Sequence, residues 1–187
     1  MKRLLLTSFD IWLPHHKSNS SDDLLEEVTR LGALPHALTL VRKLPVDVKG
    51  AVDQVIAKIR ETQPDYIICC GMAESRSCLS VESNARSTPA FTNCSMSMLP
   101  EDYQESRLHT SVNLEELVAP CQATEISHDC GKFVCEGLYY SVLDYLHSSS
   151  TKSSCIFIHV PVLTESNIRV VVDDFLLVID RLALSER

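Results

Sequence analysis

A helix pattern followed by a strand pattern stands at residues 48–71, which read VKGAVDQVIAKIRETQPDYIICCG. In residues 48–62 the apolar side chains recur at helical spacing, which predicts an amphipathic helix that ends before Pro64. Residues 66–71 form a short apolar run closed by Gly71, which is typical of a central parallel strand buried on both faces. A helix that leads directly into such a strand indicates an α/β fold.

The same alternation of strands and helices continues on both sides of this stretch. Further strands are predicted at Leu4–Phe9, Ala37–Val41 and Ser154–Val160. Further helices are predicted at Asp22–Leu34 (with Ser20 or Ser21 as N-cap), Leu114–Val118, Phe133–Leu146 and Ile168–Leu182. We therefore expect a largely parallel sheet with helices on both faces and a site at the carboxyl ends of its strands. Residues 75–103 show no period and are expected to form a long irregular loop.

The composition is that of an ordinary globular protein. The chain has 187 residues, 45% of them hydrophobic and 22% charged, which predicts one domain over residues 1–187. With 17 Lys and Arg against 25 Asp and Glu, the net charge of −8 argues against a general nucleic-acid binder or a basic membrane-surface protein. The first apolar run stops at Thr7, too early for a signal peptide, and no run approaches the ~18 apolar residues of a membrane span. These features predict a cytoplasmic protein.

The eight cysteines include no CxxC pair and form no cluster with histidine at zinc-finger spacing. Free thiols in a reducing compartment are therefore expected, and no metal site is predicted. Cys69-Cys70 is expected to place one side chain on each face of its strand, and His15-His16 to be an exposed loop pair that binds metal only adventitiously. Asp173-Asp174 is expected on a solvated helix face.

Three segments combine reactive side chains with suitable positions. Cys135 falls in the first turn of a predicted helix, where the helix N-terminus favours a thiolate, although a free cysteine is more often a buried core residue. His159 falls at the carboxyl end of a predicted strand, where a general base is expected, although it could be a core histidine with satisfied nitrogens. Glu82 could orient an imidazole, although a solvated loop glutamate is commoner.

Taken together, these segments resemble the pyroglutamyl-peptidase I family (pyrrolidone-carboxylate peptidases, cysteine peptidase family C15). Residues 157–161 match its Phe-Ile-His-Val-Pro motif residue for residue, and residues 131–135 resemble its Ala-Gly-x-aromatic-apolar-Cys motif. Residues 1–9 match its opening strand, residues 44–46 resemble its Leu-Pro-Val turn, and residues 63–82 follow its Pro-Asp-strand-Gly-x-x-x-x-Arg-x-x-x-x-x-Glu pattern. The resemblance covers nearly the whole chain in one collinear order.

The resemblance implies a three-layer α/β/α sandwich with a mostly parallel, mixed sheet of the phosphorylase/hydrolase-like kind. It implies a cysteine peptidase that removes N-terminal pyroglutamate from peptides, through a thioester and without a cofactor. Cys135 would be the nucleophile, His159 the general base and Glu82 the third member of the triad. Backbone amides at the start of the helix, and more weakly Arg76, would stabilise the oxyanion. The implied partner is a peptide or small N-blocked amide, and the family suggests a homo-oligomer, either a tetramer or a dimer.

The chain departs from the family around the expected lactam pocket. Phe9 is kept, but Trp12 replaces the second pocket aromatic, and Cys130 replaces the alanine that begins the nucleophile motif. Met72 replaces a glutamine that contacts the lactam, and it offers neither the donor nor the acceptor of that side chain. The candidate substrate-binding residues are Phe9, Trp12, Asn19, Gly71, Met72 and Val134. Two alternatives therefore stay open: the same triad acting on another N-blocked or cyclic amide, and a non-catalytic binding protein that retains the fold.

Overall fold

One six-stranded sheet forms the centre of the molecule, with the strand order β2-β1-β3-β8-β4-β7. The computed structural model describes residues 2–32, 37–87, 106–149 and 151–185. The strands of this sheet are β1 (Arg3–Phe9), β2 (Ala37–Leu44), β3 (Tyr66–Met72), β4 (Leu79–Glu82), β7 (Thr124–Ser127) and β8 (Ser154–Val160). All neighbours pair in parallel except β4 and β8, which are antiparallel. A separate antiparallel pair consists of β5 (Asn84–Arg86) and β6 (Arg107–His109).

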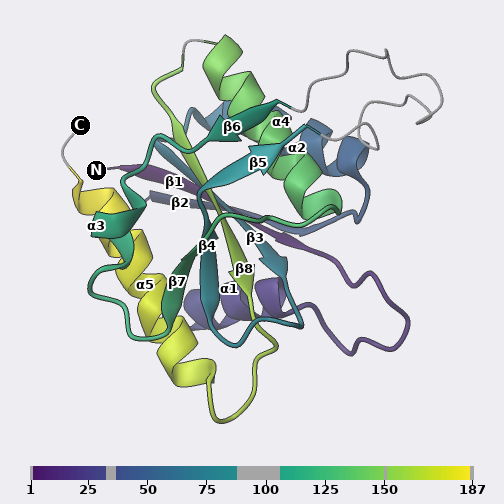
Figure 1. The fold of residues 1–187 in the computed structure, drawn as a ribbon, viewed down its shortest axis with the longest axis vertical. Coiled ribbons are helices and arrows are strands. Elements are labelled where there is room, and N and C mark those ends of the chain that lie inside the picture. Colours follow the sequence, from purple (N-terminus) through teal and green to yellow (C-terminus); the bar gives the residue numbers. More distant parts are fainter. Residues whose placement is uncertain (1, 33–36, 88–105, 150, 186–187) are drawn as a thin grey trace.

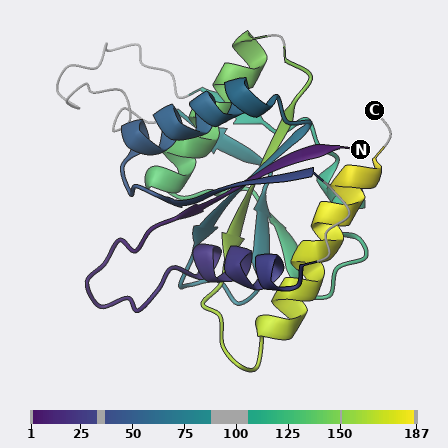
Figure 2. The ribbon, with the colours of Figure 1, turned by 180° about the vertical axis from the view of Figure 1, so that it is seen from behind.

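Helices cover both faces of the sheet. They are α1 (Ser20–Arg30), α2 (Val48–Thr62), α3 (Leu114–Val118), α4 (Val134–Ser148) and α5 (Ile168–Leu184). Helices α2 and α4 lie on one face, and α1 and α5 lie on the other (Figure 1, Figure 2). The predicted three-layer α/β/α sandwich with a mixed, mostly parallel sheet is confirmed. Among the described residues, no helix has both the length and the apolar character needed to cross a membrane.

Each face of the sheet has its own hydrophobic core, and β3 contributes to both. Ile67 and Cys69 pack with α2 and α4, whereas Ile68 and Cys70 pack with α1 and α5. This division follows from the two-residue period of a strand, and it places the two adjacent cysteines on opposite faces as expected. All four side chains are fully buried, and each isoleucine stabilises the fold by about 2 kcal/mol.

Several predicted element ends are corrected by the structure. Helix α1 ends at Arg30 rather than at Leu34. The N-cap of α1 is Asn19 rather than Ser20 or Ser21, because its Oδ1 accepts a hydrogen bond from the backbone N–H of Ser21 at 3.1 Å. Strand β2 continues past Val41 to Leu44, since its pairing with β1 extends to Phe9 despite a register shift. The helices at 48–62 and 114–118 have their predicted bounds.

The expectation of an irregular loop over 75–103 is wrong for residues 79–86, which form β4 and β5. Both strands are too short to show a period in the sequence, and polar side chains occupy buried positions in them. Ser80 and Glu82 are fully buried because they bond to side chains from distant parts of the chain. Residues 75–78 and 87 are irregular as predicted, and residues 88–103 lie outside the described residues.

Asp174 is also not on a solvated helix face as predicted, because its side chain is only 3% exposed. Its carboxylate accepts hydrogen bonds from the backbone amides of Gln122 and Ala123 and from the hydroxyl of Thr124, at 2.7–3.1 Å. The hydrogen-bond donors at the start of β7 and in the turn before it thus compensate the buried charge of Asp174. The adjacent Asp173 is exposed, as predicted.

Candidate active site

The ends of three neighbouring strands bring the predicted site residues together. Gly71 near the end of β3 pairs with His159 near the end of β8. Because β4 runs antiparallel to β8, Glu82 lies opposite Phe157, two residues from His159 on the same strand face. The Nδ1 atom of His159 is 2.8 Å from Oε1 of Glu82, and both side chains are buried. This contact joins residues 77 positions apart in the sequence.

Glu82 is a fully buried carboxylate with few partners. Its Oε2 atom is buried and has no hydrogen-bond partner among the described residues. Nη2 of Arg76 lies 3.7 Å from Oε1 of Glu82, and the hydroxyl of Tyr139 donates to the backbone carbonyl of Glu82 at 3.0 Å. The imidazole of His159, at 2.8 Å, therefore supplies the nearest compensation for the buried carboxylate of Glu82.

Cys135 occupies the second position of α4, in the first turn as predicted. Its thiol lies near the imidazole of His159, and this interaction raises the pKa of His159. A Cβ atom placed on Gly71 would lie 2.8 Å from Sγ of Cys135, so only glycine at position 71 lets the thiol come this close to β3. The result is a row of three side chains, in which the imidazole stands between a thiol and a carboxylate.

The environment of His159 favours its charged form. Burial by itself would lower the pKa of His159, but the hydrogen bonds with Cys135 and Glu82 outweigh burial and raise this pKa to about 9. At neutral pH the imidazole is therefore an imidazolium. A positive charge beside a thiol stabilises the thiolate, which is the nucleophilic form of cysteine.

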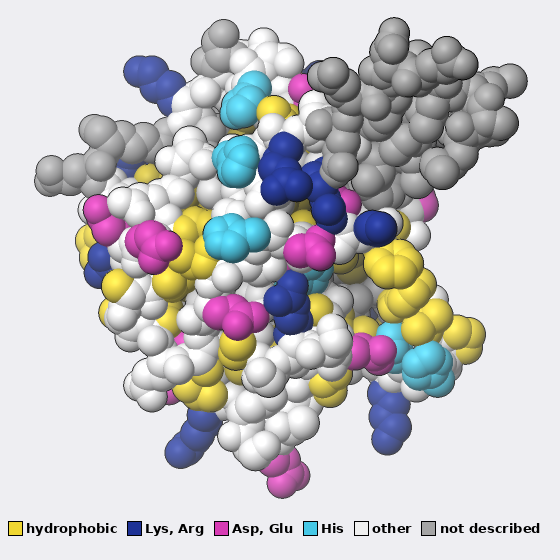
Figure 3. All heavy atoms as spheres, in the orientation of Figure 1, with side chains coloured by type: hydrophobic (Ala, Val, Ile, Leu, Met, Phe, Trp, Pro, Cys, Tyr) yellow, Lys and Arg dark blue, Asp and Glu magenta, His cyan; other side chains and the backbone are white. Residues whose placement is uncertain are grey.

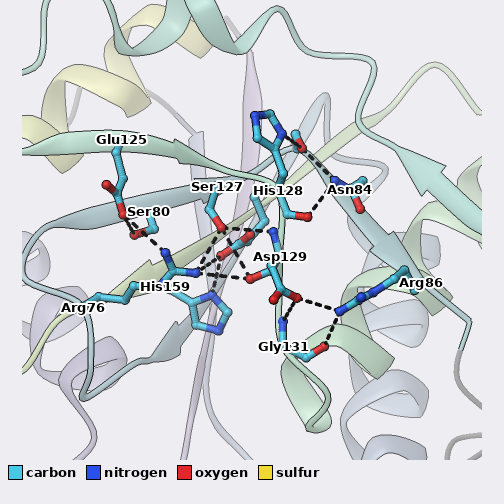
Figure 4. A network of polar contacts seen from close by, with 12 residues as sticks. Arg76, Ser80, Asn84, Arg86, Glu125, Ser127, His128, Asp129, Gly131 and His159 are labelled. Atoms are coloured by element: carbon cyan, nitrogen blue, oxygen red, sulfur yellow. Dashed lines mark hydrogen bonds and ion pairs between the residues drawn. The ribbon is translucent and has the colours of Figure 1, made fainter.

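Arg86 fixes the loop that precedes Cys135. Its guanidinium donates to Oδ1 of Asp129 at 2.6 Å and to the carbonyl of Gly131 at 3.2 Å (Figure 4). It also donates to Oε1 of Glu136 at 3.0 Å. Glu136 follows Cys135 directly and is fully buried. The sequence analysis did not predict a role for Arg86 or Glu136. The sequence feature that points to one is the charged Glu136 within the apolar pattern of the helix at 133–146.

Arg76 lies on the carboxylate side of His159 (Figure 4). Its Nη2 atom donates to Oγ of Ser127 at 3.1 Å and to the carbonyl of Asp129 at 3.2 Å, and Nη1 approaches Oε1 of Glu125 at 3.4 Å. These partners hold the guanidinium next to Glu82. Phe133, the N-cap residue of α4, makes no side-chain capping bond, which leaves the first amides of that helix available as oxyanion donors.

A pocket of about 500 Å³ opens over this row of side chains. Its lining includes these predicted site residues: Phe9, Trp12, Asn19, Met72, Arg76, Val134, Cys135 and His159. The other two predicted residues, Gly71 and Glu82, do not line the pocket. Gly71 lies next to the sulfur of Cys135, and Glu82 is fully buried. Sequence reasoning missed Phe133, which is 68% exposed and whose ring centroid is 5.8 Å from that of Trp12. The sequence feature that indicates its place at the pocket is its position, since Phe133 is a bulky apolar residue two positions before the predicted nucleophile.

Two lining residues have further roles. The amide of Asn19 donates to the carbonyl of Asp10 at 2.9 Å while its oxygen caps α1, so it also fixes the loop that carries Trp12. Cys130 places a second thiol in the pocket, and it can approach both Glu82 and His159 to within 4.8 Å. Burial, and then the nearby charge of Glu82, raises the pKa of Cys130 well above its usual value.

No family model matches the chain. A pyrrolidone-carboxylate peptidase of Vibrio vulnificus is 28% identical over 179 residues, covering 88% of this chain and 81% of the relative. The pyrrolidone-carboxylate peptidase of Brevibacillus brevis is 26% identical over 187 residues, covering 90% and 82%. The solved structure of pyroglutamyl peptidase I from Bacillus amyloliquefaciens superposes with a TM-score of 0.77 at 19% identity, covering 95% of both chains.

Sequence relatives and structural neighbours thus agree with one another and with the family suggested by the motifs. The aligned region covers 88–90% of the chain and so extends well beyond the segments around Cys135 and His159. The agreement of the fold extends over nearly all of both compared chains. The chain is therefore similar in sequence to the pyrrolidone-carboxylate peptidases over most of its length and has the fold of pyroglutamyl peptidase I.

Proposed function

We propose that this protein is a cysteine peptidase that removes an N-terminal pyroglutamyl residue from peptides. The observation that carries this proposal is the row of Cys135, His159 and Glu82 at the base of one pocket. Homology to proteins named pyrrolidone-carboxylate peptidase supports the substrate. The pocket, at about 500 Å³, has the size of an ordinary small-ligand site and accommodates a pyroglutamyl group with part of the next residue.

In the resting protein the thiol proton of Cys135 already lies on Nε2 of His159, so the reaction begins from a thiolate–imidazolium pair. Glu82 accepts a hydrogen bond from the Nδ1–H of this imidazole, which fixes the tautomer and stabilises the imidazolium. The thiolate then attacks the carbonyl carbon of the pyroglutamyl residue and forms a tetrahedral oxyanion. The first amides of α4 stabilise this oxyanion, because they are preorganised and have no side-chain cap.

The second half of the reaction releases both products. The imidazolium of His159 donates its proton to the leaving amine as the peptide bond breaks, which leaves a thioester between Cys135 and the pyroglutamyl group. His159 then removes a proton from water, and the resulting hydroxide attacks the thioester. Pyroglutamate leaves, and the thiol is restored. Arg76 places a positive charge beside Glu82, with its Nη2 atom 3.7 Å from Oε1 of that carboxylate.

Release of a fluorophore from a pyroglutamyl-arylamide tests this proposal directly. The wild-type protein is expected to turn the substrate over, and Cys135→Ala is expected to lose this turnover by a factor of about 10⁴ or more. Cys78→Ala serves as the matched control, because Cys78 is partly exposed and does not line the pocket. Full turnover in Cys135→Ala would contradict the assigned nucleophile.

Met72 favours a second candidate, in which the same triad hydrolyses another N-blocked or cyclic amide. Its side chain lines the pocket but offers no hydrogen bond to a lactam. A panel of pyroglutamyl, prolyl and N-acyl arylamides separates the two candidates by their kcat/KM values. If the lactam is the substrate, Met72→Gln should raise kcat/KM for the pyroglutamyl compound about fivefold to tenfold, the value of one neutral hydrogen bond.

A non-catalytic protein of the same fold is distinguished by thiol alkylation. If the thiolate–imidazolium pair forms, Cys135 should react with iodoacetamide at pH 6–7 well before the other cysteines. Cys69, Cys70 and Cys155 are fully buried and serve as internal controls. Equal, slow alkylation of all cysteines would argue against catalysis.

The remaining features of the proposal follow from the sequence and from homology. The substrate is a peptide or a small N-blocked amide, and no cofactor enters the mechanism. We propose a single domain over residues 1–187, a cytoplasmic location with free thiols, and assembly into a dimer or tetramer. The seven cysteines that the structure describes all carry free thiols, which suits a reducing compartment.

A further inference from the structure

A cluster of two imidazoles and one carboxylate lies at the edge of the pocket, outside the row of Cys135, His159 and Glu82. His15 and His16 belong to the loop between β1 and α1, and Glu74 belongs to the connection between β3 and β4. One ligand atom of each residue lies within 4.8 Å of a ligand atom of the other two. We propose that these three residues bind a divalent transition-metal ion of the zinc type.

The geometry is close to what such an ion requires. The ring centroids of His15 and His16 are 4.4 Å apart, and Nε2 of His16 is 2.6 Å from Oε1 of Glu74. Ligand atoms around a tetrahedral zinc ion are separated by about 3.4 Å, so shifts of about 1 Å close the site. Two imidazoles and a carboxylate are a ligand set that zinc takes in proteins, with the fourth position left to water.

His16 is a buried imidazole whose hydrogen bonds are incomplete. Its side chain is only 7% exposed, which corrects the expectation of an exposed pair for this residue. Its Nδ1 atom is buried and has no hydrogen-bond partner among the described residues. Its Nε2 atom faces Oε1 of Glu74. An ion that replaces the proton between these two atoms would bind His16 and Glu74 together, on the same side of the ring.

The cluster would connect two segments that line the pocket. Trp12 and Met72 belong to the same two segments as the histidines and Glu74, respectively, and both line the pocket. Figure 3 shows histidine and acidic side chains together beside exposed hydrophobic ones, on the side where Figure 1 draws the loop after β1. A bound ion would therefore restrain the loop that carries Trp12 relative to the end of β3.

Zinc titration by calorimetry tests the proposal in the full chain with Cys130→Ser and Cys135→Ser, which removes the pocket thiols as competing ligands. One zinc ion per chain is expected. His15→Ala and Glu74→Gln, both at exposed side chains, should each weaken binding by about tenfold or more. His109→Ala is the matched control, because His109 is exposed on β6 away from the pocket, and it should leave the affinity unchanged.

Two further readouts distinguish a ligand role from a structural one. The thermal midpoint of the thiol-free parent should rise with zinc concentration, and this rise should be lost in His15→Ala and Glu74→Gln, whose metal-free midpoints should match the parent. With Co²⁺ as a spectroscopic substitute, the thiol-free parent should show tetrahedral absorption without a thiolate charge-transfer band. Absence of saturable binding, or equal binding in His15→Ala, would overturn the proposal. Binding that requires Cys130 and Cys135 would assign the ion to the thiols instead and would equally overturn it.

Discussion

His159 stands between two groups that stabilise its proton, and the rate of the proposed reaction depends on that proton. The hydrogen bonds with Cys135 and Glu82 raise the pKa of His159 to about 9. The imidazolium is therefore present below pH 9 and is lost as the pH rises through this value. Without it, the leaving amine receives no proton and the thiolate loses its counter-ion. We expect kcat/KM to fall above pH 9.

Glu82→Gln tests the cause of this pH dependence. Removing the carboxylate removes one of the two interactions that raise the pKa of His159, so the basic limb of the kcat/KM profile should move down by about one pH unit or more. The measurement is a pH profile of pyroglutamyl-arylamide hydrolysis. Glu125→Gln is the control, since Glu125 contacts Arg76 but not His159. An unchanged basic limb in Glu82→Gln would contradict the assigned role of Glu82.

Gly71 is the residue that permits the thiol to approach β3. A Cβ atom there would lie 2.8 Å from Sγ of Cys135 and 2.9 Å from Cζ of Phe157. Gly71→Ala should therefore displace the thiol, reduce kcat strongly and destabilise the fold by about 1–3 kcal/mol. The measurements are kcat and the free energy of unfolding in urea.

A double-mutant cycle isolates the contact with sulfur. In the Cys135→Ala background the sulfur is absent, so Gly71→Ala should cost less stability than it does in the wild type. The contact with Phe157 remains in both backgrounds and explains any residual cost. Equal costs in the two backgrounds would show that the thiol does not occupy the space next to Gly71.

At the scale of elements, helix α5 is tied to β7 through one buried carboxylate. Asp174 accepts hydrogen bonds from two backbone amides and one hydroxyl at residues 122–124. Asp174→Ala leaves these buried donors unpaired and should lower the free energy of unfolding by about 2–4 kcal/mol. Asp173→Ala, next to it but exposed, should change the free energy by less than about 0.5 kcal/mol. Chemical denaturation measures the free energy of unfolding of both variants. An equal loss of stability in the two would contradict the role of Asp174 in joining α5 to β7.

Comparison of the long and short elements shows which sequence patterns are sufficient to predict a helix or a strand. Helices α2 and α4 and strands β3 and β8 were predicted because each is long enough for its period to appear. Strands β4 to β7 have only three or four residues, and all of them except β6 contain polar or charged side chains at buried positions. Their stability comes from pairing with strands far away in the sequence, which no local pattern records.

At the scale of the whole molecule, a single sheet joins the two hydrophobic cores. Leu25 of α1 belongs to one core and Leu138 of α4 to the other, and both side chains are fully buried. We expect one cooperative unfolding transition, in which Leu25→Ala and Leu138→Ala each lower the free energy of unfolding by about 2–5 kcal/mol. Circular dichroism in the far and near ultraviolet should give coincident midpoints. Two separate transitions, each sensitive to only one of the substitutions, would contradict the proposal of a single domain.

The sequence by itself determined the fold class and the order of the long elements and indicated the resemblance to the pyroglutamyl peptidases, because hydrophobic period and the motifs around Cys135 and His159 are local features. It also indicated Cys135 at a helix start and His159 at a strand end. Only the tertiary structure placed Glu82 against His159, Arg86 on Glu136, and Glu74 beside His16. These contacts join residues 50 to 77 positions apart, and their energies depend on distance and burial after the strands have paired, which the order of residues does not encode locally.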